Sequence, residues 1–141
     1  MTKDVLISIS GLQFEAEDNE PIEVVTSGNY YFKNNKHYII YDEYIDDSEL
    51  EVTKNMMIIS EDKISLSKSG PASVNMLFEP GRDTETYYNT PFGSLVIGLS
   101  NSKINATHED NLIDINIQYD LSINYSHVSN CNICLKVTPK Q

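Results

Sequence analysis

The chain has 141 residues, with 21 acidic and 10 basic side chains, so its formal charge at pH 7 is −11. Apolar residues make up 40% of it, as in a folded domain rather than a disordered chain. Nucleic acids and anionic membranes are bound through clustered Lys and Arg, and that signature is missing here, with Arg82 the only arginine. The composition predicts one domain, residues 1–141, with neither nucleic acid nor membrane as a partner.

The N-terminal segment, Met1 to Ser10, lacks the basic region and long apolar run of a secretory signal peptide. No apolar stretch approaches the roughly 18 residues that a membrane-spanning helix needs. Both observations predict a cytoplasmic protein.

Apolar and polar residues alternate with a period of two along most of the chain. The pattern is clearest from Leu112 to Tyr125, where Ile, Leu and Tyr alternate with Asp, Asn, Gln and Ser. A strand that is buried on one face produces this pattern. About ten strands are predicted in this way. They cover residues 4–12, 21–32, 36–45, 52–60, 63–69, 73–79, 84–90, 94–104, 112–125 and 132–138.

One segment also has a helical signal, because Ser48 and Glu51 have the spacing of a capping box. The apolar residues that follow do not form a stripe at helical spacing, so a strand is favoured over a short helix. The surrounding acidic run, Asp42 to Glu51, lacks the calcium-loop pattern and is interpreted as a solvated hairpin tip.

A chain of about ten strands with little or no helix must bury one face of its sheet without a covering layer of helices. Closing the sheet on itself buries that face and removes both exposed edges. The sequence therefore predicts an all-β fold, a closed antiparallel up-and-down barrel of about 8–10 strands, with a two-sheet sandwich as the alternative. Short turns between consecutive strands favour the up-and-down order over Greek-key crossings.

Several short motifs recur along the chain in a particular order and spacing. They are Glu20-x-Ile22-Glu23, Thr26-x-Gly28-x-Tyr30-Tyr31, Lys36-x-Tyr38-x-x-Tyr41-x-Glu43, Ser69-Gly70, Phe78-x-x-Gly81, Tyr88, Phe92-Gly93-x-Leu95 and Ile115-x-Ile117-x-Tyr119-Asp120. Together they resemble the YwiB-like family, bacterial proteins of uncharacterised function with a calycin-like (lipocalin-type) β-barrel. One departure is Lys68, where the family commonly has Arg before the Ser-Gly pair. The resemblance implies a calycin-like fold and no particular function.

Two hairpin registers place four polar residues on the inward face of this barrel. The first hairpin turns at Asn34-Asn35 and the second at Glu61-Asp62, and opposed residues share a face. The opposed pairs are Tyr30–Ile39, Gly28–Tyr41 and Thr26–Glu43 in the first hairpin, and Ile59–Ile64, Met57–Leu66 and Asn55–Lys68 in the second. The apolar pairs define the inside, so four polar side chains point inward at one level: Thr26, Glu43, Asn55 and Lys68.

Charges on a core face must be paired, because burial penalises an isolated ion heavily. We therefore expect Glu43 and Lys68 to lie in contact, or to be bridged by Asn55 or water. One interpretation is a structural plug that closes one end of the barrel. The other is an anchor for the polar end of a small ligand, with tyrosines as walls: Tyr30, Tyr41, Tyr88 and Tyr119.

The sequence predicts no catalytic residues, no metal site and no cofactor, since it contains no phosphate loop, nucleophile elbow or zinc-protease motif. Cys131 and Cys134 would face opposite sides of a strand, about 10 Å apart along it. That spacing is too long for a disulfide, so two free thiols are expected. His37, His108 and His127 do not supply the second ligand pair of a zinc site.

We therefore expect a non-enzymatic barrel that binds a small molecule in its interior or at its mouth. The alternative is a protein-interaction module whose lumen is filled by side chains. The candidate partners are a small-molecule ligand and a second copy of the chain, as a homodimer. A ligand binder should have a cavity of roughly 300 Å³ or more, which an interaction module does not need.

Overall fold

The computed structural model describes residues 3–11, 23–45 and 48–140, and of these the side chains of Glu23 and of residues 44–45 and 48–51 are not described. Every regular element in these ranges is a strand, which confirms the all-β prediction. Within the same ranges no helix is long and apolar enough to cross a membrane. The predicted strand ends at Leu12 and at Pro21 lie outside the described residues.

The described residues form ten strands, which correspond in order to the ten predicted segments. They are β1 (Asp4–Ser10), β2 (Glu23–Lys33), β3 (Lys36–Ile45), β4 (Ser48–Ile59), β5 (Ile64–Ser69), β6 (Val74–Phe78), β7 (Thr84–Thr90), β8 (Gly93–Glu109), β9 (Leu112–Ile123) and β10 (Ser126–Pro139).

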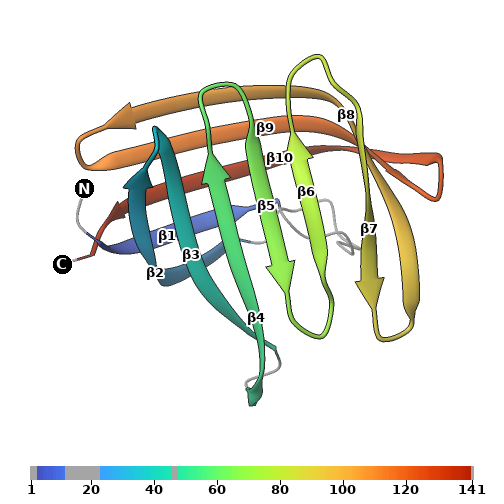
Figure 1. Ribbon diagram of the computed structural model, residues 1–141, viewed down its shortest axis with the longest axis horizontal. Coiled ribbons are helices and arrows are strands. Elements are labelled where there is room, and N and C mark those ends of the chain that lie inside the picture. Colours follow the sequence, from blue (N-terminus) through green and yellow to red (C-terminus); the bar gives the residue numbers. More distant parts are fainter. Residues whose placement is uncertain (1–2, 12–22, 46–47, 141) are drawn as a thin grey trace.

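All ten strands belong to one antiparallel sheet in the order β6-β5-β4-β3-β2-β1-β10-β9-β8-β7. Consecutive strands pair from β1 to β6 and from β7 to β10, and β10 returns to pair with β1. In Figure 1, β8, β9 and β10 cross behind β2 to β6 at a steep angle, so that the sheet curls around its own inner face. The predicted up-and-down barrel is confirmed.

The barrel is nearly closed, and its seam lies between β6 and β7. Across it, the backbone amides and carbonyls of Ser73 and Asn89 exchange two hydrogen bonds of 2.8 Å. The Thr84 hydroxyl also donates to the Leu77 carbonyl at 2.8 Å. Among the described residues no continuous ladder joins these two strands, in contrast to every other neighbouring pair.

The predicted registers are set by local turn chemistry. Asn34 and Asn35 have φ values of 54° and 62°, the left-handed conformation that a two-residue type I′ hairpin requires at both positions. Asn tolerates this conformation better than most residues. The pairs Tyr30–Ile39, Gly28–Tyr41 and Asn55–Lys68 follow as predicted.

The connection between β5 and β6 keeps the apolar face of β6 inside the barrel. Val74 lies opposite Lys68 and Phe78 opposite Ile64, so Val74, Met76 and Phe78 are all buried. Residues 70–73 supply the irregular backbone that this register needs after Gly70-Pro71.

Two sequence predictions need correction. Tyr125 is not on the inward face of a strand, because Asn124 and Tyr125 form a second left-handed turn, with φ values of 51° and 71°, between β9 and β10. β10 therefore begins at Ser126 rather than at residue 132. The segment from Ser48 is the start of a strand that pairs with the end of β3, as favoured over a helix.

The core consists of the inward-facing side chains that alternation predicts. From β2 to β6 they form successive levels across the sheet. Ile59, Ile64 and Phe78 form one level, and Ile39, Met57, Leu66 and Met76 form the next. On the facing strands, isoleucines of β9 and β10 fill the other side, including Ile115, Ile117 and Ile133. In the next level, polar groups of Tyr41, Asn55 and Lys68 enter the inward face beside the buried Val74.

Candidate functional site

A polar cluster of Glu43, Asn55 and Lys68 lies inside this wall of the barrel. The Lys68 Nζ is 3.0 Å from the Glu43 Oε1, and the Asn55 Nδ2 donates to the same oxygen at 3.2 Å. Asn55 is almost fully buried, while the side chains of Lys68 and Glu43 are 15% and 35% exposed. The predicted contact between Glu43 and Lys68, with Asn55 beside it, is confirmed.

The ladder explains how residues so distant in sequence meet. Tyr41 of β3 lies opposite Asn55 of β4, which in turn lies opposite Lys68 of β5. Gly28 lies on the other side of Tyr41, and a Cβ at that position would be 2.6 Å from the Ile40 carbonyl and 3.1 Å from the Tyr41 Cβ. Such a side chain would clash, so the glycine allows the close packing at this level.

Two buried polar atoms in this level have no hydrogen-bond partner among the described residues. They are the Tyr41 hydroxyl and the Asn55 Oδ1. Burial raises the pKa of Tyr41, and the carboxylate of Glu43 raises it further. The hydroxyl is therefore protonated and available as a donor, while the amide oxygen of Asn55 is available as an acceptor.

Lys68 connects this cluster to the barrel surface. It lines a groove of about 380 Å³ at the seam, between β5 and β6 on one side and β7 on the other. The groove is also lined by Val74, Asn75, Thr86 and Asn89. A ligand in the groove would therefore contact Lys68, the residue of the cluster that lines the groove.

The remaining predicted site residues are not brought to this cluster. Thr26 lies opposite Ile7 of β1, because the ladder between β2 and β3 ends at Gly28 and does not reach Glu43. Tyr88 is half-buried on β7, opposite Leu95. Tyr119 is in the core, where burial raises its pKa and Cys131 raises it further.

Tyr30 belongs to a second cluster, at the opposite mouth. Its hydroxyl is 2.6 Å from the Nδ1 of His37, and the His37 ring stacks on His108 with centroids 4.7 Å apart. Burial lowers the pKa of His37, and the neighbouring His108 lowers it further. His108 also lines a pocket of about 390 Å³ under the turn between β4 and β5. Sequence analysis missed this cluster, because no register links β3 to β8.

Among the described residues, two ring contacts join opposite walls of the barrel. His37 of β3 and His108 of β8 are five strands apart in the sheet, and Phe78 of β6 packs on Tyr119 of β9 with centroids 4.9 Å apart. Side chains therefore fill the lumen at these levels. Among the described residues, one pocket lies at the mouth beside His108 and one groove at the seam beside Lys68.

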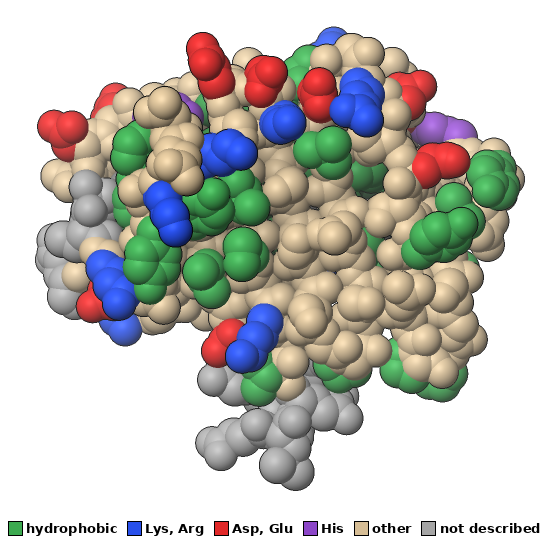
Figure 2. Space-filling model, viewed as in Figure 1, with side chains coloured by type: hydrophobic (Ala, Val, Ile, Leu, Met, Phe, Trp, Pro, Cys, Tyr) green, Lys and Arg blue, Asp and Glu red, His purple; other side chains and the backbone are tan. Residues whose placement is uncertain are grey.

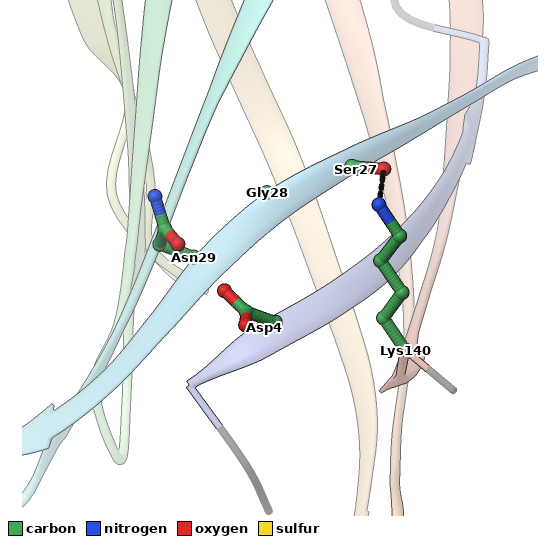
Figure 3. Close-up of a pocket in the computed structure, with 5 residues that line it drawn as sticks. All are labelled: Asp4, Ser27, Gly28, Asn29 and Lys140. Carbon is green, nitrogen blue, oxygen red and sulfur yellow. Dashed lines mark hydrogen bonds between the residues drawn. The ribbon is translucent and has the colours of Figure 1, made fainter.

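A third pocket, of about 480 Å³, lies where β1, β2 and the C-terminal segment meet (Figure 3). Its lining includes Asp4, Asn29 and Lys140, and the Lys140 Nζ donates to the Ser27 hydroxyl at 3.0 Å. Most of these side chains are exposed, and none belongs to the buried clusters. The geometry favours the seam groove, because Lys68, which lines it, belongs to the level in which two buried polar atoms lack partners.

The two cysteines are free, as predicted. Cys131 is half-buried and packs against the core, whereas Cys134 is exposed on the other face of β10. Within the described ranges, no group of three or more His, Cys, Asp or Glu side chains is placed to hold a metal ion.

Comparison with known proteins agrees with this fold. The model of a family described as a domain of unknown function (DUF1934) matches residues 7–135. The chain is 30% identical over 118 residues to the uncharacterized beta-barrel protein YwiB of Bacillus subtilis, covering 82% of this chain and 81% of that protein. The crystal structure of the Bacillus subtilis ywiB protein superposes with a TM-score of 0.80 at 26% identity, over 99% of this chain and 93% of that one. The resemblance found in the sequence is confirmed.

Proposed function

Since the chain belongs to the DUF1934 family, whose function is unknown, we propose a role from its own geometry: it is a non-enzymatic protein that binds a small polar molecule in the groove beside Lys68. The groove, of about 380 Å³, has the size of a small-molecule site. We further propose that it acts in the cytoplasm, where its two free thiols would stay reduced.

The observation that carries this proposal is the pair of unpartnered atoms behind Lys68. A buried donor or acceptor without a partner costs about 1–3 kcal/mol. The Tyr41 hydroxyl and the Asn55 Oδ1 together offer one donor and one acceptor. A head group with one acceptor and one donor, reaching past the Lys68 side chain, would satisfy both atoms.

The charges favour an uncharged ligand. Lys68 is already paired with Glu43, so the cluster as a whole is neutral. The net charge of −11 disfavours the approach of anions. An amide or a polyol has the required donor and acceptor without a charge.

Native mass spectrometry of the freshly purified protein tests this proposal. We expect a small-molecule adduct that is lost on denaturation and that is absent from Lys68→Met. Lys140→Met is the matched control, because it removes a lysine from the pocket of Figure 3 instead. An unliganded wild-type mass, or an adduct that Lys68→Met retains, would contradict the proposal.

The contacts across the lumen favour a second candidate, a protein-interaction module. Phe78 on Tyr119 and His37 on His108 leave those levels filled, as such a module permits. This candidate predicts no small-molecule adduct in the same measurement. It also predicts that binding to a partner protein is weakened only by substitutions of exposed residues.

A further inference from the structure

The ends of the β7–β8 and β9–β10 hairpins carry no charged side chains, although the molecule carries a formal charge of −11. The charges that border them in the ladders are Glu85, opposite Gly98, and Asp120, between Ser100 and Asn130. Two segments without Asp, Glu, Lys or Arg, residues 86–102 and 121–135, meet there. The ladder pairs Ile97 with Ile123 and Leu99 with Leu121. In Figure 1 the β7–β8 and β9–β10 hairpins lie on the same side of the molecule. The lower right of Figure 2, over β7 and the start of β8, shows no red or blue side chains.

The same side exposes large apolar side chains. Phe92, in the β7–β8 turn, is 99% exposed, and Tyr125, in the β9–β10 turn, is 78% exposed. Tyr87 and Val128 are 64% and 51% exposed. Interface centres are depleted of charge and enriched in aromatic residues, so both properties of this side are those of a protein contact.

Hydrogen bonds hold the Phe92 turn in a defined shape. The Phe92 amide donates to the Thr90 hydroxyl at 3.1 Å, and that hydroxyl donates to the Gly93 carbonyl at 2.8 Å. Next to the turn, the Ser94 hydroxyl donates to the Asn89 side chain at 2.7 Å. The second turn is tied to the first hairpin, because the Asn124 amide donates to the Val96 carbonyl at 2.8 Å. Little ordering is then required when a partner binds.

We propose that these two hairpin ends, residues 86–97 and 123–129, form the contact surface of a homodimer. A basic partner would need acidic residues on this side, and an acidic partner would need Lys or Arg. The segments contain neither, so the surface fits an equally uncharged apolar surface. A second copy provides one through two-fold symmetry, in which the same patch meets itself. Contact elsewhere would bring together two surfaces that carry the negative charge of the molecule. This inference does not depend on ligand binding at the seam.

Sedimentation velocity of the full chain from about 1 μM to about 200 μM measures the monomer–dimer equilibrium. We expect reversible dimers, and a rise in Kd of about tenfold or more for Phe92→Asp and for Val128→Asp, because each places a carboxylate in the apolar contact. Raising NaCl from about 50 mM to about 500 mM should tighten the dimer, since salt screens the repulsion between the two acidic chains.

Val25→Asp is the matched control. Val25 lies on β2, outside the charge-free segments, is 56% exposed, and gains the same charge as Val128→Asp. Its Kd should stay within about twofold of wild type, because the ladders place Val25 two strands from Lys136, at the other end of β10 from Val128. A wild-type chain that remains monomeric at the highest concentration, or a dimer that tolerates both Phe92→Asp and Val128→Asp, overturns the proposal.

Discussion

The ion pair of Lys68 and Glu43 is only partly buried, and this decides how much it stabilises the fold. A fully buried pair that loses one partner costs about 3–5 kcal/mol. Here the Glu43 side chain is 35% exposed, so water can solvate its carboxylate. We expect Lys68→Met to lower the free energy of unfolding by about 1–2 kcal/mol. Urea denaturation measures this value.

Adding Glu43→Gln to Lys68→Met tests whether the unpaired carboxylate of Glu43 causes the loss of stability. Because the second change removes the carboxylate that was left unpaired, the double variant should recover at least about half of the loss. A double variant that is no more stable than Lys68→Met would contradict this interpretation of the pair. Asn55 is left unchanged in both variants, so its bond to the side chain at position 43 is retained as a control.

His37 should make stability depend on pH. Its pKa is lowered in the fold, first by burial and then by His108, so the folded state binds fewer protons than the unfolded state below about pH 6.5. Stability is then full above the unfolded pKa and declines as the pH falls toward the folded pKa, by at most about 1.4 kcal/mol per pH unit for one group.

Urea denaturation from about pH 7.5 to about pH 5 should therefore show a smaller decline in His37→Gln than in wild type. The matched change His127→Gln, in the exposed β9–β10 hairpin, should leave the decline as it is. Equal declines in wild type and His37→Gln would contradict the assignment to His37.

The hairpin between β2 and β3 depends on two residues in the left-handed conformation. A β-branched residue pays about 1–2 kcal/mol there, since its Cβ approaches the backbone oxygen. Asn35→Val should therefore destabilise the protein by about this amount in thermal or urea unfolding. Asn105→Val, in the exposed end of β8, is the control and should change stability by less than about 0.5 kcal/mol. Equal effects would show that this turn does not constrain the hairpin.

The strands also show which parts of the sheet local sequence can predict. Alternation and the turns at Asn34-Asn35 and Glu61-Asp62 predict the pairing of Gly28 with Tyr41 in β2–β3 and of Asn55 with Lys68 in β4–β5, and the ladders agree. The same alternation wrongly extended the strand that begins at Leu112 to Tyr125. A tyrosine at an apolar position of the pattern gives no indication that a turn begins there. Left-handed Asn124 could have provided one, since Asn is favoured in such turns.

The seam between β6 and β7 is where the barrel should open most readily. Amides of these strands that point toward the seam have no ladder partner in the described part of the chain, apart from the pair formed by Ser73 and Asn89. Hydrogen exchange at neutral pH should therefore be faster in β6 and β7 than in β9, which is paired on both sides. Equal protection in the two regions would indicate that a full ladder closes the barrel in solution.

The sequence by itself determined the strand order, the inward face and the meeting of Glu43, Asn55 and Lys68. These features follow from a period of two and from short hairpins, whose contacts lie between neighbouring strands. Only the tertiary structure brought His37 onto His108 and Phe78 onto Tyr119. It also placed the seam groove beside Lys68 and joined two uncharged segments on one side. Those contacts depend on how the sheet twists and closes, and that geometry is set by the packing of the whole core rather than by any local pattern.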